Sequence, residues 1–343
     1  MSDPTDPLAT TFGQSRQTTR RPQVRAIFYQ ALFAAAVGLA AWYLISNAAG
    51  NQEARRIASG FGFLAREAGF EIGESTIISF SAADTYLRAL AVGLLNTGRV
   101  AMLAISSSTF IGALVGLARL SPNWLLKKLA AAYVETLRNV PLVVQLFFWY
   151  AVITETLPAP EGAHNPFPGV FLSNRGMAFP VLRWDAPFHL DVPVLSGFNF
   201  SGGAVLSPEF VALFLGLALY TAAFIGEIVR AGIRSVERGQ VEAAQSLGLS
   251  RRQAMRFVIV PQALRVIVPP ATSQFLNCTK NSSLAVAIGY PDLVSIANTT
   301  INQTGQAIEG IAIIMFVYLT ISFAISALMN WYNRGYALRG SHR

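Results

Sequence analysis

The stretch that decides the fold lies in the second half of the chain and reads Glu242-Ala243-Ala244-Gln245-Ser246-Leu247-Gly248-Leu249-Ser250, running on to Val258-Ile259-Val260-Pro261. Good helix formers, with apolar residues at 236, 241, 243, 244 and 247, predict a helix over 236–247. Gly248 stands where a helix favours a left-handed residue at its end. Ser250 and Gln253 have the spacing of a capping box, so a second helix begins there, and we expect it to stop near Pro261.

The composition around this stretch is that of a membrane protein. Of the 343 residues, 53% are hydrophobic and only 13% are charged, and the mean hydropathy is +0.44. A soluble domain carries about twice that share of charge. Several apolar runs reach the roughly 20 residues needed to cross a bilayer. The sequence therefore predicts an all-α, polytopic transmembrane helical bundle.

The net charge of +8 reflects topology rather than a nucleic-acid partner. Arginines precede the first apolar run and concentrate again between 230 and 265, in segments that we place on the cytoplasmic side. The acidic residues cluster in segments that we place on the external side of the membrane. This is the positive-inside pattern, which puts both termini in the cytoplasm. The single cysteine, Cys278, and the scattered histidines predict no disulfide and no metal site.

The apolar runs divide the chain into about six spans with both ends on one side. A cytoplasmic tail over 1–25 leads into an uncleaved first helix over 26–46. The remaining segments are an external stretch over 47–85, a core over 86–331 and a cytoplasmic tail over 332–343. Within the core we expect helices over 86–118, 126–157, 208–234, 263–287 and 306–331, an external loop over 158–206, which is too irregular to cross lipid, and the cytoplasmic coupling region over 236–264.

Charged and polar residues inside spans are candidates for function, because an unpaired charge is costly in a bilayer. Glu135 and Arg138 share a helix face near mid-depth. Pro141 frees the carbonyl near Leu137, so the region suits a zwitterionic solute. The alternative, a self-neutralising pair, is equally open. With them we place Asn139 and Gln145 on the solute path, and a broken segment after Pro269-Pro270 that contains Asn277, Lys280, Asn281 and Ser282.

Glu227 and Arg230 repeat the three-residue spacing near the cytoplasmic end of their helix. There they can reach water, which favours a structural role.

The deciding stretch resembles the EAA motif of membrane permeases in ATP-binding-cassette importers. That motif is Glu-Ala-Ala, three residues, Gly, nine residues and Ile-x-Leu-Pro; here Val258 and Val260 replace the Ile and Leu. An ordinary helical hairpin is the other interpretation, and it leaves the membrane context unexplained. The resemblance implies that the two helices lie in a groove of a separate ATPase subunit, with small residues at the contact. The contact residues it implies are Gly239, Glu242, Ala243, Ala244, Gly248, Leu249, Ser250 and Arg251.

The chain between 86 and 331 is similar to the polar amino-acid permeases of this family. The similar residues are Tyr133-Val-Glu-Thr-Leu-Arg138-Asn-Val-Pro141-Leu-Val-Val-Gln145-Leu-Phe, Gly239-Gln240, Pro261-Gln262-Ala263-Leu264-Arg265 and Lys280-Asn-Ser-Ser-Leu284. An extra first helix, the 47–85 segment and the long 158–206 loop resemble the larger permease subunit of general L-amino-acid importers of Gram-negative bacteria. The resemblance implies a five-helix core, a second permease subunit, an ATPase dimer and a periplasmic amino-acid-binding protein, in the inner membrane.

The chain has no Gly-x-x-x-x-Gly-Lys-Ser/Thr phosphate loop, so we expect it to bind no cofactor, with ATP and Mg²⁺ held by the partner ATPase. It is thus a transport subunit rather than an enzyme. The alternatives are an ion-coupled secondary transporter of a small polar solute, which would be expected to contain internal repeats, and a membrane scaffold without transport.

Overall fold

The computed structural model describes residues 20–54, 59–183 and 189–337, in two compact units, Met1–Ser59 and Gly60–Arg343. The first unit contains one helix, α1 (Arg20–Ala54), whose stretch Arg25–Asn47 is long and apolar enough to cross a membrane. Residues 1–19 of the predicted tail lie outside the described part. The helix extends beyond its predicted end at residue 46 and includes the first residues of the stretch over 47–85, which the sequence analysis predicts to be an external segment.

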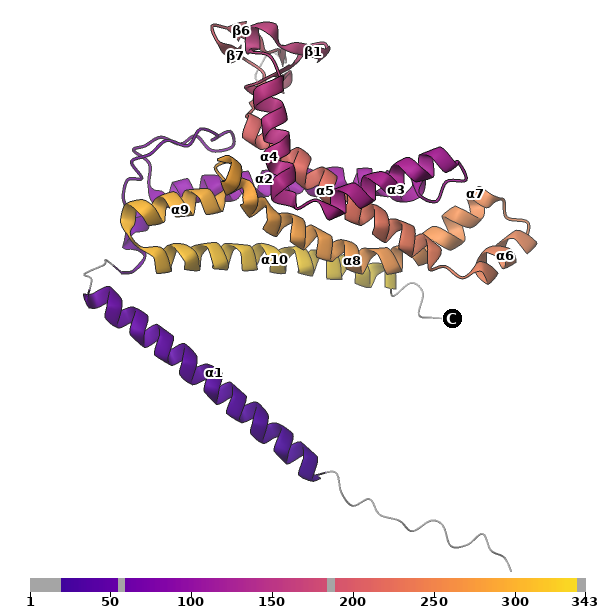
Figure 1. The fold of residues 1–343 in the computed structure, drawn as a ribbon, viewed down its shortest axis with the longest axis horizontal. Helices are drawn as coiled ribbons and strands as arrows, with labels where there is room; N and C mark the ends of the chain where they lie inside the picture. The colour runs from indigo at the N-terminus through magenta and orange to yellow at the C-terminus, as the bar shows by residue number, and fades with distance from the viewer. Residues whose placement is uncertain (1–19, 55–58, 184–188, 338–343) are drawn as a thin grey trace, which may run out of the picture. The chain divides into compact units, whose positions relative to one another are not determined.

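The second unit is a bundle of long helices that run side by side (Figure 1). Its four longest helices are α2 (Tyr86–Ala118), α5 (Pro208–Arg234), α8 (Val260–Asn281) and α10 (Ala307–Ala337). Over the described residues of both units, five helices could span a membrane, and a bent pair could add a sixth. The polytopic helical bundle is confirmed, and α2 and α5 begin and end at the predicted residues.

Glycines bring α2 and α5 into close contact. A Cβ added to Gly116 would lie 2.7 Å from the carbonyl oxygen of Gly226, and one added to Gly112 would lie 2.7 Å from the side chain of Ile225. Small residues four apart on one helix let two backbones approach where packing, rather than the hydrophobic effect, holds helices together in lipid. This contact fixes the two helices that carry Arg119 and Glu227.

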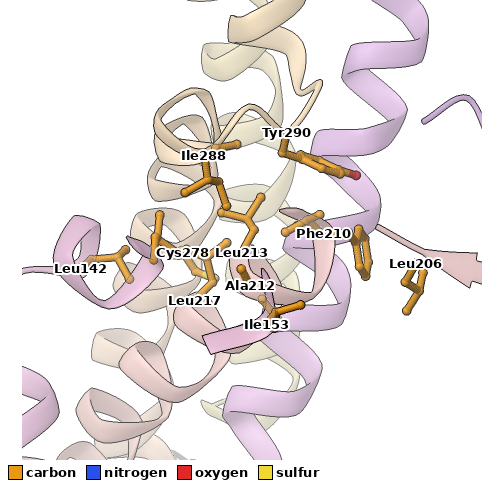
Figure 2. Close-up of a cluster of buried hydrophobic side chains, with 14 residues drawn as sticks. Leu142, Ile153, Leu206, Phe210, Ala212, Leu213, Leu217, Cys278, Ile288 and Tyr290 are labelled. Atoms are coloured by element: carbon orange, nitrogen blue, oxygen red, sulfur yellow. The ribbon is translucent and has the colours of Figure 1, made fainter. Parts of the chain in front are cut away.

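The prediction of one continuous third helix over 126–157 is wrong. The segment forms two helices, α3 (Trp124–Asn139) and α4 (Leu142–Ala151), bent by 105° and followed by a π-helical turn, η2 (Val152–Thr156). Pro141 cannot continue the hydrogen-bond ladder of α3, and Val140, directly before it, is extended. Leu142 and Ile153 then pack with α5 and Cys278 of α8 in the cluster drawn in Figure 2, which holds α4 in its new direction.

The helix breaks predicted at Pro261 and at Pro269-Pro270 are also wrong. The helix that follows the coupling bend continues through these prolines. It runs from α7 (Arg251–Ala254) through a π-helical turn, η4 (Met255–Ile259), into α8, with Pro261 in the first turn of α8. The wider π turn accommodates a residue that lacks an N–H. The helix also continues through Pro269 and Pro270 and changes only at η5 (Ser282–Ile288), a 3₁₀ segment.

Residues 60–85, which we call the strap, form an irregular segment with one 3₁₀ turn, η1 (Phe61–Ala65). Phe63, Ala68 and Ile72 of the strap are buried against α2 and α9 (Leu293–Thr304). The strap is also tied to the start of α10, because the backbone N–H of Gly60 donates to Glu309 Oε1 at 2.7 Å. The strap therefore belongs to the folded second unit.

Residues 158–206, which we call the lobe, are more regular than predicted, because they contain short antiparallel strands at the far end of α4 (Figure 1). A four-stranded sheet has the order β1-β2-β3-β8, and two hairpins pair β4 with β5 and β6 with β7. The short helical turn η3 (Pro160–Gly162) precedes the strands. The strands are β1 (His164–Phe167), β2 (Val170–Ser173), β3 (Gly176–Phe179), β4 (Val181–Arg183), β5 (His189–Asp191), β6 (Val194–Ser196), β7 (Asn199–Ser201) and β8 (Ala204–Leu206).

Candidate functional site: the coupling bend and the charged cavity

The coupling bend joins α6 (Arg238–Ser246) to α7, and hydrogen bonds within the turn fix its backbone conformation. Gly248 has a φ of 80°, its N–H donates to Gln245 O at 2.9 Å, and the N–H of Leu249 donates to Ala244 O at 3.1 Å. These two bonds form a Schellman motif. The helix–glycine turn–helix prediction is therefore confirmed.

The second half of the bend is a reciprocal capping box. Gln253 N donates to Ser250 Oγ at 3.4 Å, and Ser250 N donates to Gln253 Oε1 at 2.9 Å. Because both helix ends satisfy their own backbone groups, the bend holds its shape without outside contacts.

The bend presents most of its surface to solvent. Ala244 packs inward with Ala254 of α7, and both are buried. Leu249 is half-buried, and the other predicted contact residues are exposed: Gly239, Glu242, Ala243, Gly248, Ser250 and Arg251. Leu247, which the sequence reasoning left out of the contact set, is 83% exposed at the tip of the turn. A fixed bend with an exposed apolar tip fits a groove on a partner.

The charged cavity lies between α2, α3 and α5 and has a volume of about 340 Å³. Arg119, at the end of α2, and Arg230 both pair with Glu227 of α5. The guanidinium of Arg138 lies 4.9 Å from the centre of the Phe224 ring. Glu135, Arg138 and Asn139 line the same cavity, which lies at the end of α2 and beside the last turns of α5 rather than at the predicted mid-depth. Sequence reasoning missed Arg119 and Phe224 as members of this site, although the Gly112 and Gly116 spacing signals that α2 and α5 meet here.

Glu135 and Arg138 do not neutralise each other. Among the described residues, neither makes an ion pair, and both side chains are exposed toward the cavity. Glu227, by contrast, is held by two arginines, which agrees with the structural role predicted for Glu227 and Arg230. Among the described residues, the cavity thus offers a carboxylate, Glu135, and a guanidinium, Arg138, that form no ion pair, and Arg138 lies against the Phe224 ring.

Gln145 does not line that cavity. It is buried in α4, and its Nε2 donates to Leu137 O at 2.9 Å and to Val140 O at 3.0 Å. The freed carbonyl that the sequence indicates is present, but Gln145 occupies it. This residue holds the α3–α4 bend together.

The remaining predicted residues lie apart from the cavity, on α8 and its end. Asn277 and Lys280 are exposed on one face of α8, and Asn281 is half-buried. Ser282 is buried, with its hydroxyl donating to Thr279 O at 2.7 Å. The structure of this chain therefore separates the two predicted parts of the solute path.

Known proteins are similar to this chain in both sequence and fold. The family described as "binding-protein-dependent transport system inner membrane component" matches residues 108–337. The general L-amino acid transport system permease protein AapQ of Rhizobium johnstonii is 44% identical, over 97% of this chain and 98% of its own length. The putative amino-acid ABC transporter permease protein YhdX of Escherichia coli is 46% identical, over 92% of this chain and 95% of its own length.

Solved structures agree with this relationship. A crystal structure of an amino acid ABC transporter with histidines has a chain that is 27% identical, with a TM-score of 0.54, over 73% of this chain and 94% of that one. An inward-facing structure of the MetNI methionine ABC transporter, 18% identical with a TM-score of 0.51 over 73% and 97%, shares the fold. This chain belongs to the family of binding-protein-dependent transport system inner membrane components, the multi-pass permease subunits of ATP-binding-cassette importers.

Proposed function

We propose that this chain is one of two permease subunits of an ATP-driven importer of L-amino acids. The observation that carries the proposal is the coupling bend, a self-sufficient turn whose exposed tip is shaped to enter a groove on an ATPase subunit. The names of relatives that align with nearly the whole chain indicate amino acids as the solute class.

In the proposed complex this chain binds no cofactor. ATP and Mg²⁺ bind to a separate pair of ATPase subunits, and a periplasmic binding protein delivers the solute. We assign the second permease to a paralogue rather than to another copy, because the strap and the lobe resemble additions found in the larger of two permease subunits. Arginines of the coupling region, such as Arg238 and Arg251, support a cytoplasmic location for the bend and both termini.

The charged cavity supplies the solute contacts on this chain. Arg138 suits the carboxylate of an amino acid, and Glu135 suits its ammonium group, because each needs a partner in a low-dielectric path. Asn277 and Lys280 extend the path from the exposed face of α8, where the second permease would complete it.

The test is reconstitution of the purified complex in proteoliposomes, with binding protein outside and ATP inside. Uptake of labelled L-amino acids should require ATP hydrolysis and should persist when ionophores remove every ion gradient. An ATP-independent uptake that collapses with the ion gradient would instead identify an ion-coupled transporter.

A further inference from the structure

The strap and the lobe meet at the start of α5, and a cleft lies between them. It consists of a cavity of about 590 Å³ between the strap and the lobe and an adjoining cavity of about 460 Å³ between the strap and residues 289–299. Both cavities are lined by Gly73 and Glu74 of the strap and by Ser207 and Glu209 at the start of α5. These volumes lie in the range of small-molecule sites. We call this feature the strap–lobe cleft.

The floor of the cleft is built and buried. Glu74 is only 7% exposed, with Ser207 Oγ donating to its Oε2 at 2.8 Å and Arg99 Nη1 donating to its Oε1 at 3.3 Å. Asn96 ties the strap to the bundle, because its Nδ2 donates to Glu74 O at 2.8 Å and to Pro291 O at 3.0 Å. Burial raises the pKa of the Glu74 carboxyl. A cleft held in this way keeps its shape when empty.

Unsatisfied polar groups lie at this floor and at the lobe. Tyr290 is fully buried against Phe210 (Figure 2), and its hydroxyl has no hydrogen-bond partner among the described residues, although Glu74 and Arg99 are its electrostatic neighbours. On the lobe, the buried Oδ1 of Asn174 also lacks a partner within the described part of the chain. Asn174 lines the larger cavity, so its unpartnered oxygen indicates a site that water or a polar ligand completes, whereas Tyr290 lines neither cavity.

The charges on the walls suit a zwitterion. Glu71 and Glu209 stand on the strap and α5 sides, and Arg175 stands on the lobe side. Glu209 is oriented by Tyr150, whose hydroxyl donates to its Oε1 at 3.1 Å. Arg175 is exposed, and its guanidinium makes no ion pair with the described residues. Glu209 and Arg175 line the larger cavity together and form no ion pair with the described residues, so each can hold one end of an amino acid. Glu71 lines only the smaller cavity, where its Oε1 accepts from Ala82 N at 3.1 Å.

We propose that the strap–lobe cleft is a second amino-acid site, at which the ammonium group binds to Glu209 and the carboxylate binds to Arg175 in the larger cavity. The inference rests on the proposed function, since it names a further contact for the same solute. It also gives the strap a function: these residues precede the matched range 108–337 and contribute Glu74 to the floor of the cleft.

The test measures equilibrium binding to the purified complex in lipid nanodiscs without binding protein. L-Glutamine, L-glutamate and L-leucine are first tried in ATP-driven uptake, and the fastest becomes the labelled probe. Binding is measured with Arg138→Gln present throughout, which removes the charged cavity as a second site. The variants are Glu209→Gln and Arg175→Gln, with Glu67→Gln, an exposed strap carboxylate outside the cleft, as the matched control. Glu74 is left unchanged because it is part of the buried floor.

We expect Glu209→Gln to weaken binding by about tenfold or more and Arg175→Gln by a similar factor, since each substitution removes a charged hydrogen bond to the amino acid. Glu67→Gln should bind as the parent does. Equal binding by all variants, or no binding to the parent while uptake proceeds, overturns the cleft site and leaves the proposed function standing. Unchanged probe binding with weakened binding-protein association also overturns it, and marks the cleft as a docking surface. A complex without any ATP-driven uptake rejects the proposed function instead.

Discussion

The side-chain amide of Gln145 binds the carbonyl oxygen of Leu137 at 2.9 Å, from the far side of Pro141. The same nitrogen binds Val140 O at 3.0 Å, so one side chain satisfies both carbonyl groups at a 105° bend. A buried carbonyl without a partner costs about 1–3 kcal/mol. The bend between α3 and α4 therefore depends on this residue.

Gln145→Met should lower stability by about 2 kcal/mol or more and reduce uptake, because methionine has a similar shape but donates no hydrogen bond. Thermal unfolding of the complex and initial uptake rates measure the two effects. The matched control is Gln274→Met in α8, a half-buried glutamine that makes no hydrogen bond with the described residues. Equal effects of the two substitutions would contradict the role given to Gln145.

Substitutions at Gly248 should follow backbone conformation rather than side-chain size. A Cβ at this position would meet no atom within 4 Å, so only the φ of 80° restricts it. We expect Gly248→Asn to retain most uptake, Gly248→Ala to lose roughly 1–2 kcal/mol of stability in the bend, and Gly248→Val to abolish uptake while the chain still inserts.

Co-purification of the ATPase subunit measures the coupling defect directly. Gly62→Ala serves as the control, since its φ is not positive and its surroundings are equally open. Normal uptake by Gly248→Val would remove the bend as the coupling element.

Glu135 and Arg138 in the charged cavity should not behave as an ion pair in which each residue neutralises the other. Glu135→Gln and Arg138→Gln should each reduce uptake, and the double variant should remain at least as impaired as either single variant, because the two side chains form no ion pair with each other. Uptake at equal membrane abundance measures this. Recovery in the double variant would favour a neutralised pair, as expected when only an unpaired buried charge is costly.

Asp292 should make stability depend on pH. It is fully buried at the start of α9, where its Oδ1 accepts from Ser295 N at 2.8 Å, and burial raises its pKa from 3.8 to about 7. A raised carboxyl pKa means that the fold favours the protonated form, so the stabilisation is complete below pH 3.8 and is lost as the pH rises through about 7.

Asp292→Asn keeps the cap and removes the charge. Its melting temperature should therefore exceed that of the parent by an amount that grows between about pH 4 and pH 7 and stays constant at higher pH. Differential scanning fluorimetry in detergent measures this, with Asp84→Asn, a half-buried carboxyl of the strap, as the control. A difference that does not vary with pH would reject a buried, titrating Asp292.

The orientation of the chain is testable by cysteine labelling after Cys278→Ala. Phe70→Cys in the strap and Arg175→Cys in the lobe should react with an impermeant thiol reagent in intact spheroplasts. Ser250→Cys in the coupling bend should react only after permeabilisation. The arginine distribution motivates this expectation, and the reverse pattern would invert the topology.

Local hydrogen-bond chemistry was predictable from the sequence, as Gly248 and Ser250 illustrate. Their motifs are complete within a few residues, so tertiary contacts do not change them. The first residues of α2 and α5 were predictable for the same reason, since Thr85 and Ser207 cap the starts of these helices with their own side chains.

The prolines were not predictable in this way, because the outcome depends on what surrounds each one. Pro141 breaks its helix because Gln145 takes over the freed carbonyls and α4 packs elsewhere. Pro261 does not break its helix, because a π turn precedes it. The charged cavity was even less predictable, because it forms between residues far apart in the sequence. Arg119 pairs with Glu227, 108 positions away, because glycines let α2 and α5 pack closely.

The unbroken helix from Arg251 to Asn281 has a mechanical consequence. At 1.5 Å per residue it forms a lever about 45 Å long, with the coupling bend at one end and Lys280 near the other. A lever without an internal joint converts a small tilt at one end into a displacement at the other that grows with its length. A movement of the bend is therefore transmitted to the face that carries Asn277 and Lys280. The π turn before Pro261 and the Pro269-Pro270 pair are the two places where the helix could bend and absorb part of that movement.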